Sequence, residues 1–246
     1  MRFYFIRHAQ SQNNLLWDQT GTNKGRSQDA ELTPLGQQQA ESLARFLQER
    51  VDEFGVTHLY TSLMLRAVMT GATMADALGL SPVAWEDLHE TGGIYVEDEQ
   101  TGQAIGQPGK HRAYFQECYP RLILPDSLNE AGWWNRPFEE REQRLARAQR
   151  FLRDLLERHG QTDDRVAVVS HGAFYNYFLS ALLDWPRKDG YWFILHNAAI
   201  TRIDLGSGYS GILEPVRASA ARVGHVNTRA GLVSAGVAST SIIQGG

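Results

Sequence analysis

The stretch Arg2-Phe3-Tyr4-Phe5-Ile6-Arg7-His8-Ala9-Gln10-Ser11 places a guanidinium and an imidazole directly after four apolar residues. Such an uninterrupted apolar run predicts a short strand that is buried on both faces of a parallel sheet. In open α/β sheets, ligands bind outside the carboxyl ends of the strands. We therefore expect Arg7 and His8 to lie at a ligand-binding edge of the sheet.

A second apolar run ends in the same way. The segment Arg165-Val166-Ala167-Val168-Val169-Ser170-His171-Gly172 predicts another buried strand, and a helix from Ala173 to Leu183 is expected to follow it. Two strands then deliver a histidine to one edge, and the helix start can direct free N–H groups at an anion there. Together the two runs predict a site for a phosphoryl group.

Helical and strand patterns alternate along most of the chain. They predict a polar loop at 13–31, helices at 34–51, 64–78 and 139–159, strands at 57–62, 82–86 and 198–205, and an edge strand at 212–216. This alternation is typical of an α/β fold. We expect a three-layer α/β/α, doubly wound, mostly parallel sheet whose connections bring the strand ends to one edge.

Residues 92–137 interrupt the alternation. The segment is rich in glycine, proline and aromatic residues, which favours an inserted lid or substrate loop. The residues from about 217 to 246 are small and weakly patterned, so we expect a weakly ordered tail there. The chain, 1–246, is therefore interpreted as a single domain with an inserted lid.

The composition is ordinary for a soluble protein, with 42% hydrophobic and 21% charged residues. A net charge of −4 argues against nucleic acid or a membrane surface as a partner. Cys118 is the single cysteine, which excludes an intrachain disulfide and fits a reducing compartment. With no apolar stretch of membrane-span length, we expect a cytoplasmic protein with a small phosphorylated substrate, and we leave a homodimer open.

Side chains suited to phosphoryl chemistry converge at the predicted edge: Arg7, His8, Arg66, Glu90 and His171. Arginine grips phosphate oxygens in pairs, and a neutral histidine can attack phosphorus to give a covalent intermediate. The neighbouring guanidinium groups lower the pKa of an imidazole and so keep it neutral. Glu90 can protonate the leaving group. Because the arginines neutralise the phosphoryl oxygens, no metal or other cofactor is expected.

These residues resemble the histidine phosphatase superfamily, in its phosphoglycerate mutase-like branch. Five motifs match in order: Arg7-His8-Ala9-Gln10-Ser11, Leu32-Thr33-Pro34-Leu35-Gly36, Thr61-Ser62 with Arg66-Ala67, Leu88-His89-Glu90, and Ser170-His171-Gly172. Ala9 stands where the family signature has glycine. The resemblance covers the chain up to about Val216.

The resemblance implies a role for each site residue. His8 is the nucleophile that becomes phosphohistidine, and Glu90 is the proton donor. Glu86 and Asp87 lie close by and stay open as alternatives for the acid. The phosphoryl group is held by a set of residues at the same edge: Arg7, Asn14, Arg66, His171 and Gly172.

The predicted activity is that of a metal-independent, histidine acid-type phosphatase, a phosphoric monoester hydrolase. Two alternatives stay open. A phosphoglycerate mutase would use the same site but return the phosphoryl group to a sugar-acid hydroxyl. A non-catalytic phospho-ligand binding module would keep the site without turnover. The phosphatase is favoured because residues 92–137 do not resemble the Lys/Arg- and Pro-rich insertion of mutases, and because the five presumed catalytic positions are filled.

Overall fold

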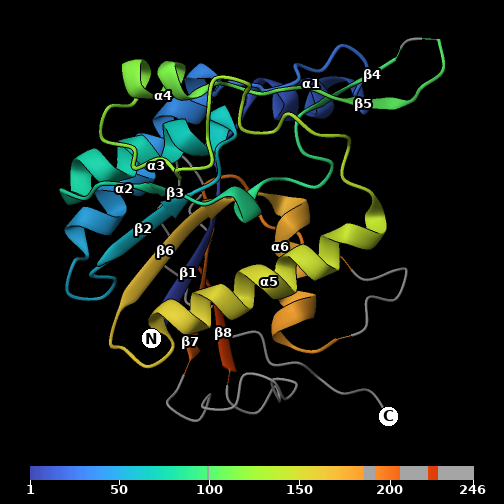
Figure 1. Ribbon diagram of the computed structural model, residues 1–246. Helices are drawn as coiled ribbons and strands as arrows, with labels where there is room; N and C mark the ends of the chain where they lie inside the picture. Colours follow the sequence, from blue (N-terminus) through green and yellow to red (C-terminus); the bar gives the residue numbers. More distant parts are fainter. Residues whose placement is uncertain (99, 186–191, 206–220, 227–246) are drawn as a thin grey trace.

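The computed structural model of the protein describes residues 1–98, 100–185, 192–205 and 221–226. The strands of the main sheet are β1 (Arg2–Arg7), β2 (His58–Thr61), β3 (Val83–Ala84), β6 (Arg165–Ser170), β7 (Ile200–Leu205) and β8 (Ala221–Val226). Their spatial order is β3-β2-β6-β1-β7-β8 (Figure 1). The first four in this order run parallel, whereas β7 and β8 are each antiparallel to the preceding strand. The predicted α/β fold with a mostly parallel sheet is thus confirmed.

Helices cover both faces of this sheet (Figure 1). On one face lie α2 (Pro34–Glu49) and α3 (Leu65–Leu78), and on the other lie α5 (Arg141–His159) and α6 (Gly172–Leu182). The sheet and its two helical layers form the three-layer arrangement that the alternation of elements predicts.

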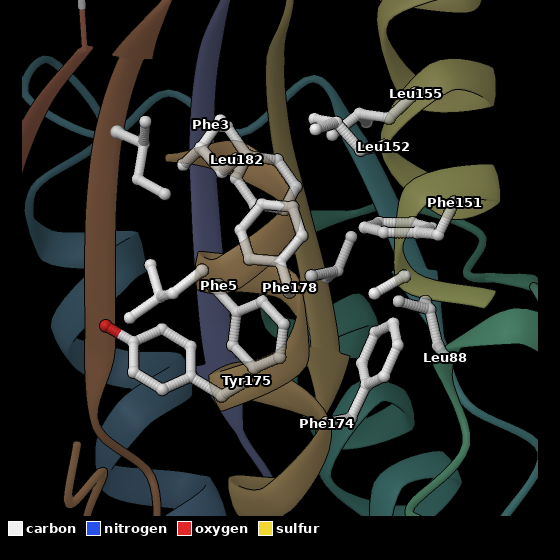
Figure 2. Packing of buried hydrophobic residues seen from close by; sticks show 14 of the residues in the cluster. Phe3, Phe5, Leu88, Phe151, Leu152, Leu155, Phe174, Tyr175, Phe178 and Leu182 are labelled. Atoms are coloured by element: carbon white, nitrogen blue, oxygen red, sulfur yellow. The ribbon is translucent and has the colours of Figure 1, made fainter. Parts of the chain in front are cut away.

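The side chains of β1 alternate between the two helical layers. Phe3 and Phe5 join the cluster under α5 and α6, where the rings of Phe5 and Phe178 stack with centroids 5.5 Å apart (Figure 2). Tyr4 and Ile6 join the opposite cluster with α2 and α3. These four apolar side chains are all buried, and each such burial contributes about 1.5–3 kcal/mol. The apolar run therefore holds both layers to the sheet.

Parallel pairing sets the two histidine-bearing strand ends side by side. β1 pairs with β6 so that Arg7 lies opposite Ser170, and the N–H of His8 donates to the Ser170 carbonyl at 2.9 Å. The end of β2 lies level with this position on the other side of β6. His8 and His171 consequently leave the sheet at the same edge.

The helix α1 (Gln12–Thr20) occupies part of the segment 13–31, for which the sequence predicts a loop. It buries no side chain, so it lacks the apolar stripe by which a helix is recognised in a sequence. Ser11 and Asn14 form a capping box at its start, and Gly21 ends it in the left-handed conformation with φ 66°. Capping rather than burial defines this helix.

Two other elements are shorter than predicted. The helix expected over 34–51 ends at Glu49, and Val51, expected on its buried stripe, is 58% exposed. The strand expected over 82–86 is only the two-residue β3, which a short 3-10 helix, η1 (Glu86–Leu88), follows.

The segment expected as an inserted lid contains regular elements as well as loops. They are β4 (Tyr95–Glu97), β5 (Ala104–Gly106) and α4 (Arg112–Cys118), and the two strands pair antiparallel. Buried Trp133 and Trp134 join the start of α3 in a separate apolar cluster. The role of this segment as a lid stays a prediction.

β8 lies in the tail from about 217 to 246, where the sequence predicts no regular element. The rest of that tail and the edge strand predicted at 212–216 fall outside the described residues. None of the described helices has the length and apolar composition that a bilayer crossing demands.

Candidate active site

His8 follows β1 and is almost completely buried. Its Nδ1 lies 2.7 Å from the carbonyl oxygen of Ala9, and its Nε2 accepts from Arg66 Nε at 3.1 Å. Because the carbonyl can only accept, Nδ1 carries the proton and Nε2 keeps the lone pair. Burial lowers the pKa of His8 well below its usual value, and the charges of Arg66 and Arg7 lower it further. His8 is therefore a neutral imidazole.

The half-buried guanidinium group of Arg7 and the buried one of Arg66 flank His8. Arg7 donates from Nη1 to the Leu195 carbonyl at 2.6 Å, and its Nε has no partner among the described residues. Arg66, in the first turn of α3, binds His8 through Nε, while its Nη1 is unpartnered within the same ranges. Buried N–H donors without a protein acceptor are costly, and an anion that binds here would satisfy them.

Nearby carboxylates act on the pKa values of both guanidinium groups. Burial lowers the pKa of Arg7, and the negative charge of Glu90 acts in the opposite direction. Burial also lowers the pKa of Arg66, whereas the charges of Asp29 and Glu90 raise it. Glu90 thus acts on both arginines, as the sequence predicts from its place after β3.

His171 faces His8 from the end of β6, with ring centroids 5.0 Å apart. Its Nε2 lies 2.9 Å from Ser62 Oγ, which also accepts the Met64 N–H at 3.2 Å. The hydroxyl proton of Ser62 can therefore point to Nε2, which leaves the ring proton on Nδ1. That Nδ1 has no partner in the part of the chain that the structure describes. Burial lowers the pKa of His171, and Arg66 adds to the effect, so this ring is a neutral N–H donor.

Glu90 caps the first turn of α6 from across the site. Its Oε1 accepts from the backbone N–H groups of Thr91 and Phe174, both at 2.9 Å, and its Oε2 accepts from Ala173 at 3.1 Å. The sequence predicts that free N–H groups of this helix point at the phosphoryl group. That expectation is wrong for Ala173 and Phe174, because the carboxylate of Glu90 occupies their N–H groups.

The two alternative acids are engaged elsewhere. Asp87 binds Arg150 of α5 with both oxygens, at 2.7 and 2.9 Å. Glu86 accepts a hydrogen bond from Ser127 Oγ at 2.5 Å. Of the three carboxylates, Glu90 is the one bound to the helix that follows His171.

A buried ion pair holds the loop that carries the candidate acid. Arg147 of α5 binds both oxygens of Glu139, at 2.6 and 2.9 Å, and these side chains are 3% and 6% exposed. Arg147 also donates to the carbonyl groups of Asp87 and His89, at 2.6 and 2.9 Å. Glu139 accepts the N–H of Gly92 at 3.3 Å. The loop is therefore fixed on both sides of Glu90.

Asn14 and Gly172, expected in the phosphate pocket, lie beside the flanking groups. Asn14 Oδ1 accepts from Asn197 Nδ2 at 3.1 Å, and Asn197 also donates to the His8 carbonyl at 3.0 Å. A Cβ on Gly172 would lie 3.4 Å from Arg7 Nε. Asn14 thus supports the backbone of His8, and Gly172 lets the guanidinium lie close to α6.

The start of α2 packs directly on the loop that follows His8. A Cβ on Gly36 would lie 2.0 Å from the carbonyl oxygen of Gln10, so no side chain fits at this position. The N–H of Thr33 donates to the same carbonyl at 3.0 Å. The motif around Gly36 therefore positions the loop rather than contacting a substrate.

Asp29 is a member of the site that the sequence does not single out. Its Oδ1 accepts the Leu65 N–H at 3.0 Å, next to Arg66, and its Oδ2 is buried without a partner among the described residues. Burial raises the pKa of Asp29 to about 6, and the charge of Arg66 opposes this. An isolated aspartate in a polar segment has no periodic signal, so only the folded chain reveals its contact with α3.

Comparison with known proteins assigns the chain to a family. The model of the histidine phosphatase superfamily (branch 1) matches residues 3–215. The chain belongs to this superfamily. The resemblance that the motifs indicate is confirmed, and membership of the histidine phosphatase superfamily supports a phosphoryl-transfer activity.

Relatives within the histidine phosphatase superfamily include proteins named for both hydrolysis and isomerisation. The chain is 32% identical over 214 residues to "Putative phosphoserine phosphatase 2" of Hydrogenobacter thermophilus, covering 83% of this chain and 89% of that protein. It is 26% identical over 204 residues to "Probable phosphoglycerate mutase GpmB" of Erwinia tasmaniensis, covering 83% and 85%.

Solved structures of proteins named as phosphatases share the fold. A mycobacterial glucosyl-3-phosphoglycerate phosphatase in complex with VO3 aligns with a TM-score of 0.57 at 21% identity, over 90% of this chain and 96% of that one. A phosphoserine phosphatase of Entamoeba histolytica in complex with 3-phosphoglyceric acid aligns with a TM-score of 0.53 at 21% identity, over 83% and 90%.

Proposed function

We propose that the protein hydrolyses phosphate monoesters of a small substrate through a phosphohistidine at His8. The observation that carries the proposal is the neutral imidazole of His8 beside buried N–H groups of Arg7, Arg66 and His171 that have no partner among the described residues. A lone pair for phosphorus and donors for the phosphoryl oxygens thus occur together. The sequence identity to a named phosphoserine phosphatase supports hydrolysis.

In the first half-reaction, His8 Nε2 attacks phosphorus and the bond from phosphorus to the ester oxygen breaks. The Arg66 Nε–H, which donates a hydrogen bond to Nε2 in the structure, donates to a phosphoryl oxygen instead and so frees the lone pair of Nε2. The bond from Nδ1–H to the Ala9 carbonyl holds the ring in this tautomer. Glu90 donates a proton to the leaving oxygen, from Oε2, which has a single backbone partner.

In the second half-reaction, water attacks the phosphohistidine and the bond from phosphorus to Nε2 breaks. Glu90, now a carboxylate, accepts a proton from that water. Inorganic phosphate leaves and His8 returns to its neutral form. The same two steps with a sugar-acid hydroxyl in place of water would give a mutase.

The proposal includes independence from metal ions. Arg7 and Arg66 supply fixed positive charge where charge develops on the phosphoryl oxygens, which is the electrostatic role that a metal ion has in other phosphoryl-transfer sites. We expect turnover of p-nitrophenyl phosphate to be unchanged by EDTA. Loss of the phosphorylation step on chelation would contradict this part of the proposal.

The decisive test is phosphoryl labelling of the enzyme. Rapid mixing with a radiolabelled phosphate monoester should give an acid-labile, base-stable phosphoenzyme, as expected for phosphohistidine. His8→Ala should abolish the label and lower kcat by more than about 10³-fold, because the nucleophile is lost. His111→Asn, which removes an exposed histidine, is the matched control and should label normally. Equal labelling of His8→Ala would overturn the proposal, and absence of label in the native enzyme would favour a binding module.

The identity to a named phosphoglycerate mutase makes isomerisation the second candidate. Incubation with 3-phosphoglycerate and a bisphosphorylated primer separates the two reactions. We expect release of inorganic phosphate to exceed isomerisation. Faster isomerisation would replace the phosphatase by the mutase, and a panel of monoesters that includes phosphoserine would then define the substrate.

A further inference from the structure

A second cluster of titratable side chains lies at the opposite end of the sheet from His8. His58 begins β2, His159 ends α5 and Asp164 directly precedes β6. The Nδ1 of His159 lies 2.8 Å from Asp164 Oδ2, and the Nδ1 of His58 lies 3.7 Å from Asp164 Oδ1. Each residue offers one ligand atom, and these three atoms all lie within 4.8 Å of one another.

We propose that His58, His159 and Asp164 bind a divalent cation such as Zn²⁺ or Co²⁺. Two imidazole nitrogens and a carboxylate oxygen are donors that suit these borderline-soft ions. Ligand atoms at about 2.0–2.2 Å from a tetrahedral zinc ion stand about 3.3 Å apart. The separations of 2.8 and 3.7 Å run from the two imidazoles to different oxygens of Asp164 and lie on either side of that value, so side-chain movements must bring one set of ligand atoms around the ion.

Tyr60 supports His159 in the way that a metal-bound histidine requires. The phenol oxygen of Tyr60 lies 2.9 Å from His159 Nε2. With the proton on Nε2 donated to this oxygen, Nδ1 keeps its lone pair for the ion. Such a hydrogen bond on the second ring nitrogen fixes both tautomer and orientation. The His159 side chain is 6% exposed, so packing also holds the ring.

Two of the three side chains in the cluster are partly open to solvent. The side chain of His58 is 42% exposed and that of Asp164 is 27% exposed, in contrast to buried His159. A cation can therefore enter from solvent, and water can complete its coordination. His58 Nδ1 also lies 2.9 Å from Thr57 Oγ1, and the ion would replace this contact.

A bound ion would join the end of α5 to the starts of two strands that are far apart in the sequence. The length of β2 separates it from Ser62, which contacts His171. Four residues of strand span about 13 Å. We therefore assign the ion a structural role, and expect it to raise the melting temperature without taking part in phosphoryl transfer.

Titration of the metal-stripped full chain with Co²⁺ tests the proposal. We expect one Co²⁺ per chain with a visible absorption band, displacement of that band by Zn²⁺, and a rise in melting temperature of about 5 °C at saturating Zn²⁺. His58→Ala and Asp164→Ala should each weaken Co²⁺ binding by more than about tenfold. Both positions are partly exposed, so the variants should fold.

His111→Asn provides the control for loss of a histidine. His111 is exposed and lies 3.0 Å from the carboxylate of Glu130. Its side chain also caps the N-terminus of α4, and asparagine can replace it in that role. This variant should bind Co²⁺ like the native chain. His8 and His171 remain in His58→Ala, so a binding event lost in that variant belongs to the cluster. Equal Co²⁺ affinity in native, His58→Ala and Asp164→Ala protein would overturn the proposal, as would the absence of stoichiometric binding.

Discussion

His8 and His171 present different ring nitrogens to the candidate active site, because each has a different fixed partner. The Ala9 carbonyl binds Nδ1 of His8, which therefore carries the proton and leaves a lone pair on Nε2. The Ser62 hydroxyl binds Nε2 of His171, which leaves the proton of that ring on Nδ1. One ring therefore offers a lone pair and the other an N–H group. Two neutral imidazoles at the same pH can thus act as the nucleophile and as a hydrogen-bond donor to the bound anion.

Glu90 accepts hydrogen bonds from α6 and, in the proposed mechanism, donates a proton. Substitution can separate these two roles. In Glu90→Gln the single side-chain oxygen can still accept the Phe174 N–H, whereas the amide nitrogen cannot accept the Ala173 N–H and cannot serve as an acid. We expect kcat for alkyl phosphates to fall at least about 10²-fold and that for p-nitrophenyl phosphate to fall much less, since an activated leaving group needs little protonation.

Glu90→Ala is the structural control for this prediction. It loses the acceptor for the helix as well as the acid, so its melting temperature should fall below that of Glu90→Gln. Steady-state kinetics with both ester classes provide the measurement. Equal slowing of alkyl and aryl phosphates in Glu90→Gln would remove Glu90 from the acid role.

At the scale of elements, α5 acts as the support of the loop between η1 and β4. Arg147 and Glu139 form a buried pair, and Arg147 also binds the carbonyls of Asp87 and His89, which precede the candidate acid. The helix therefore has an apolar face for the sheet and one charged residue that reaches the site. Sequence periodicity predicts the first but has no signal for the second.

Arg147→Met should lower the free energy of unfolding by about 3–5 kcal/mol, because Glu139 is left as an unpaired buried charge. The double variant Arg147→Met/Glu139→Leu should recover much of this loss. Its kcat should stay low, since the bonds to the loop carbonyls are absent in both variants. Urea denaturation and kinetics measure the two effects.

Arg150→Met is a matched control on the same helix. Arg150 is 48% exposed and pairs with Asp87, so its loss should cost less than about 1 kcal/mol. A cost for Arg147→Met as small as that for Arg150→Met would show that the buried pair does not support the loop.

At the scale of the whole molecule, burial of the site couples its titration to folding. Burial lowers the pKa of His8, His89 and His171 well below the usual value. On acidification below about pH 6.5, the unfolded chain binds protons at these rings that the folded chain does not. Asp29 acts in the opposite sense between about pH 6 and 4, because its pKa in the folded chain is raised to about 6.

We expect the free energy of unfolding to fall as the pH is lowered from 7.5 to 5.5. Each histidine contributes up to about 1.4 kcal/mol per pH unit, and Asp29 offsets about one of them. His171→Gln should lower this pH dependence by up to about 1.4 kcal/mol per pH unit, because one buried neutral ring is removed. Denaturant titrations at several pH values measure the slope. A flat profile in the native protein would contradict the burial of neutral rings.

Much of the fold could be predicted because its signals are local. The apolar run of Phe3–Ile6 and the helical stripe through Leu43 and Leu47 are visible in the sequence and are buried in the structure. Arg7 and His8 follow a strand, so their place at the sheet edge follows from the topology of α/β folds. α1 was not predictable in this way, because it buries nothing and depends on its caps.

The amino-acid sequence by itself determined the layers, the strand ends and the residue types at the site, since periodicity and strand termini are properties of neighbouring residues. Tertiary structure alone decided that Glu90 occupies the N–H groups of α6, that Asp29 meets the start of α3, and that Arg147 reaches the loop. It also decided that His58 and His159 share Asp164. These contacts join residues from separate elements, and their hydrogen-bond geometry exists only after the elements have packed.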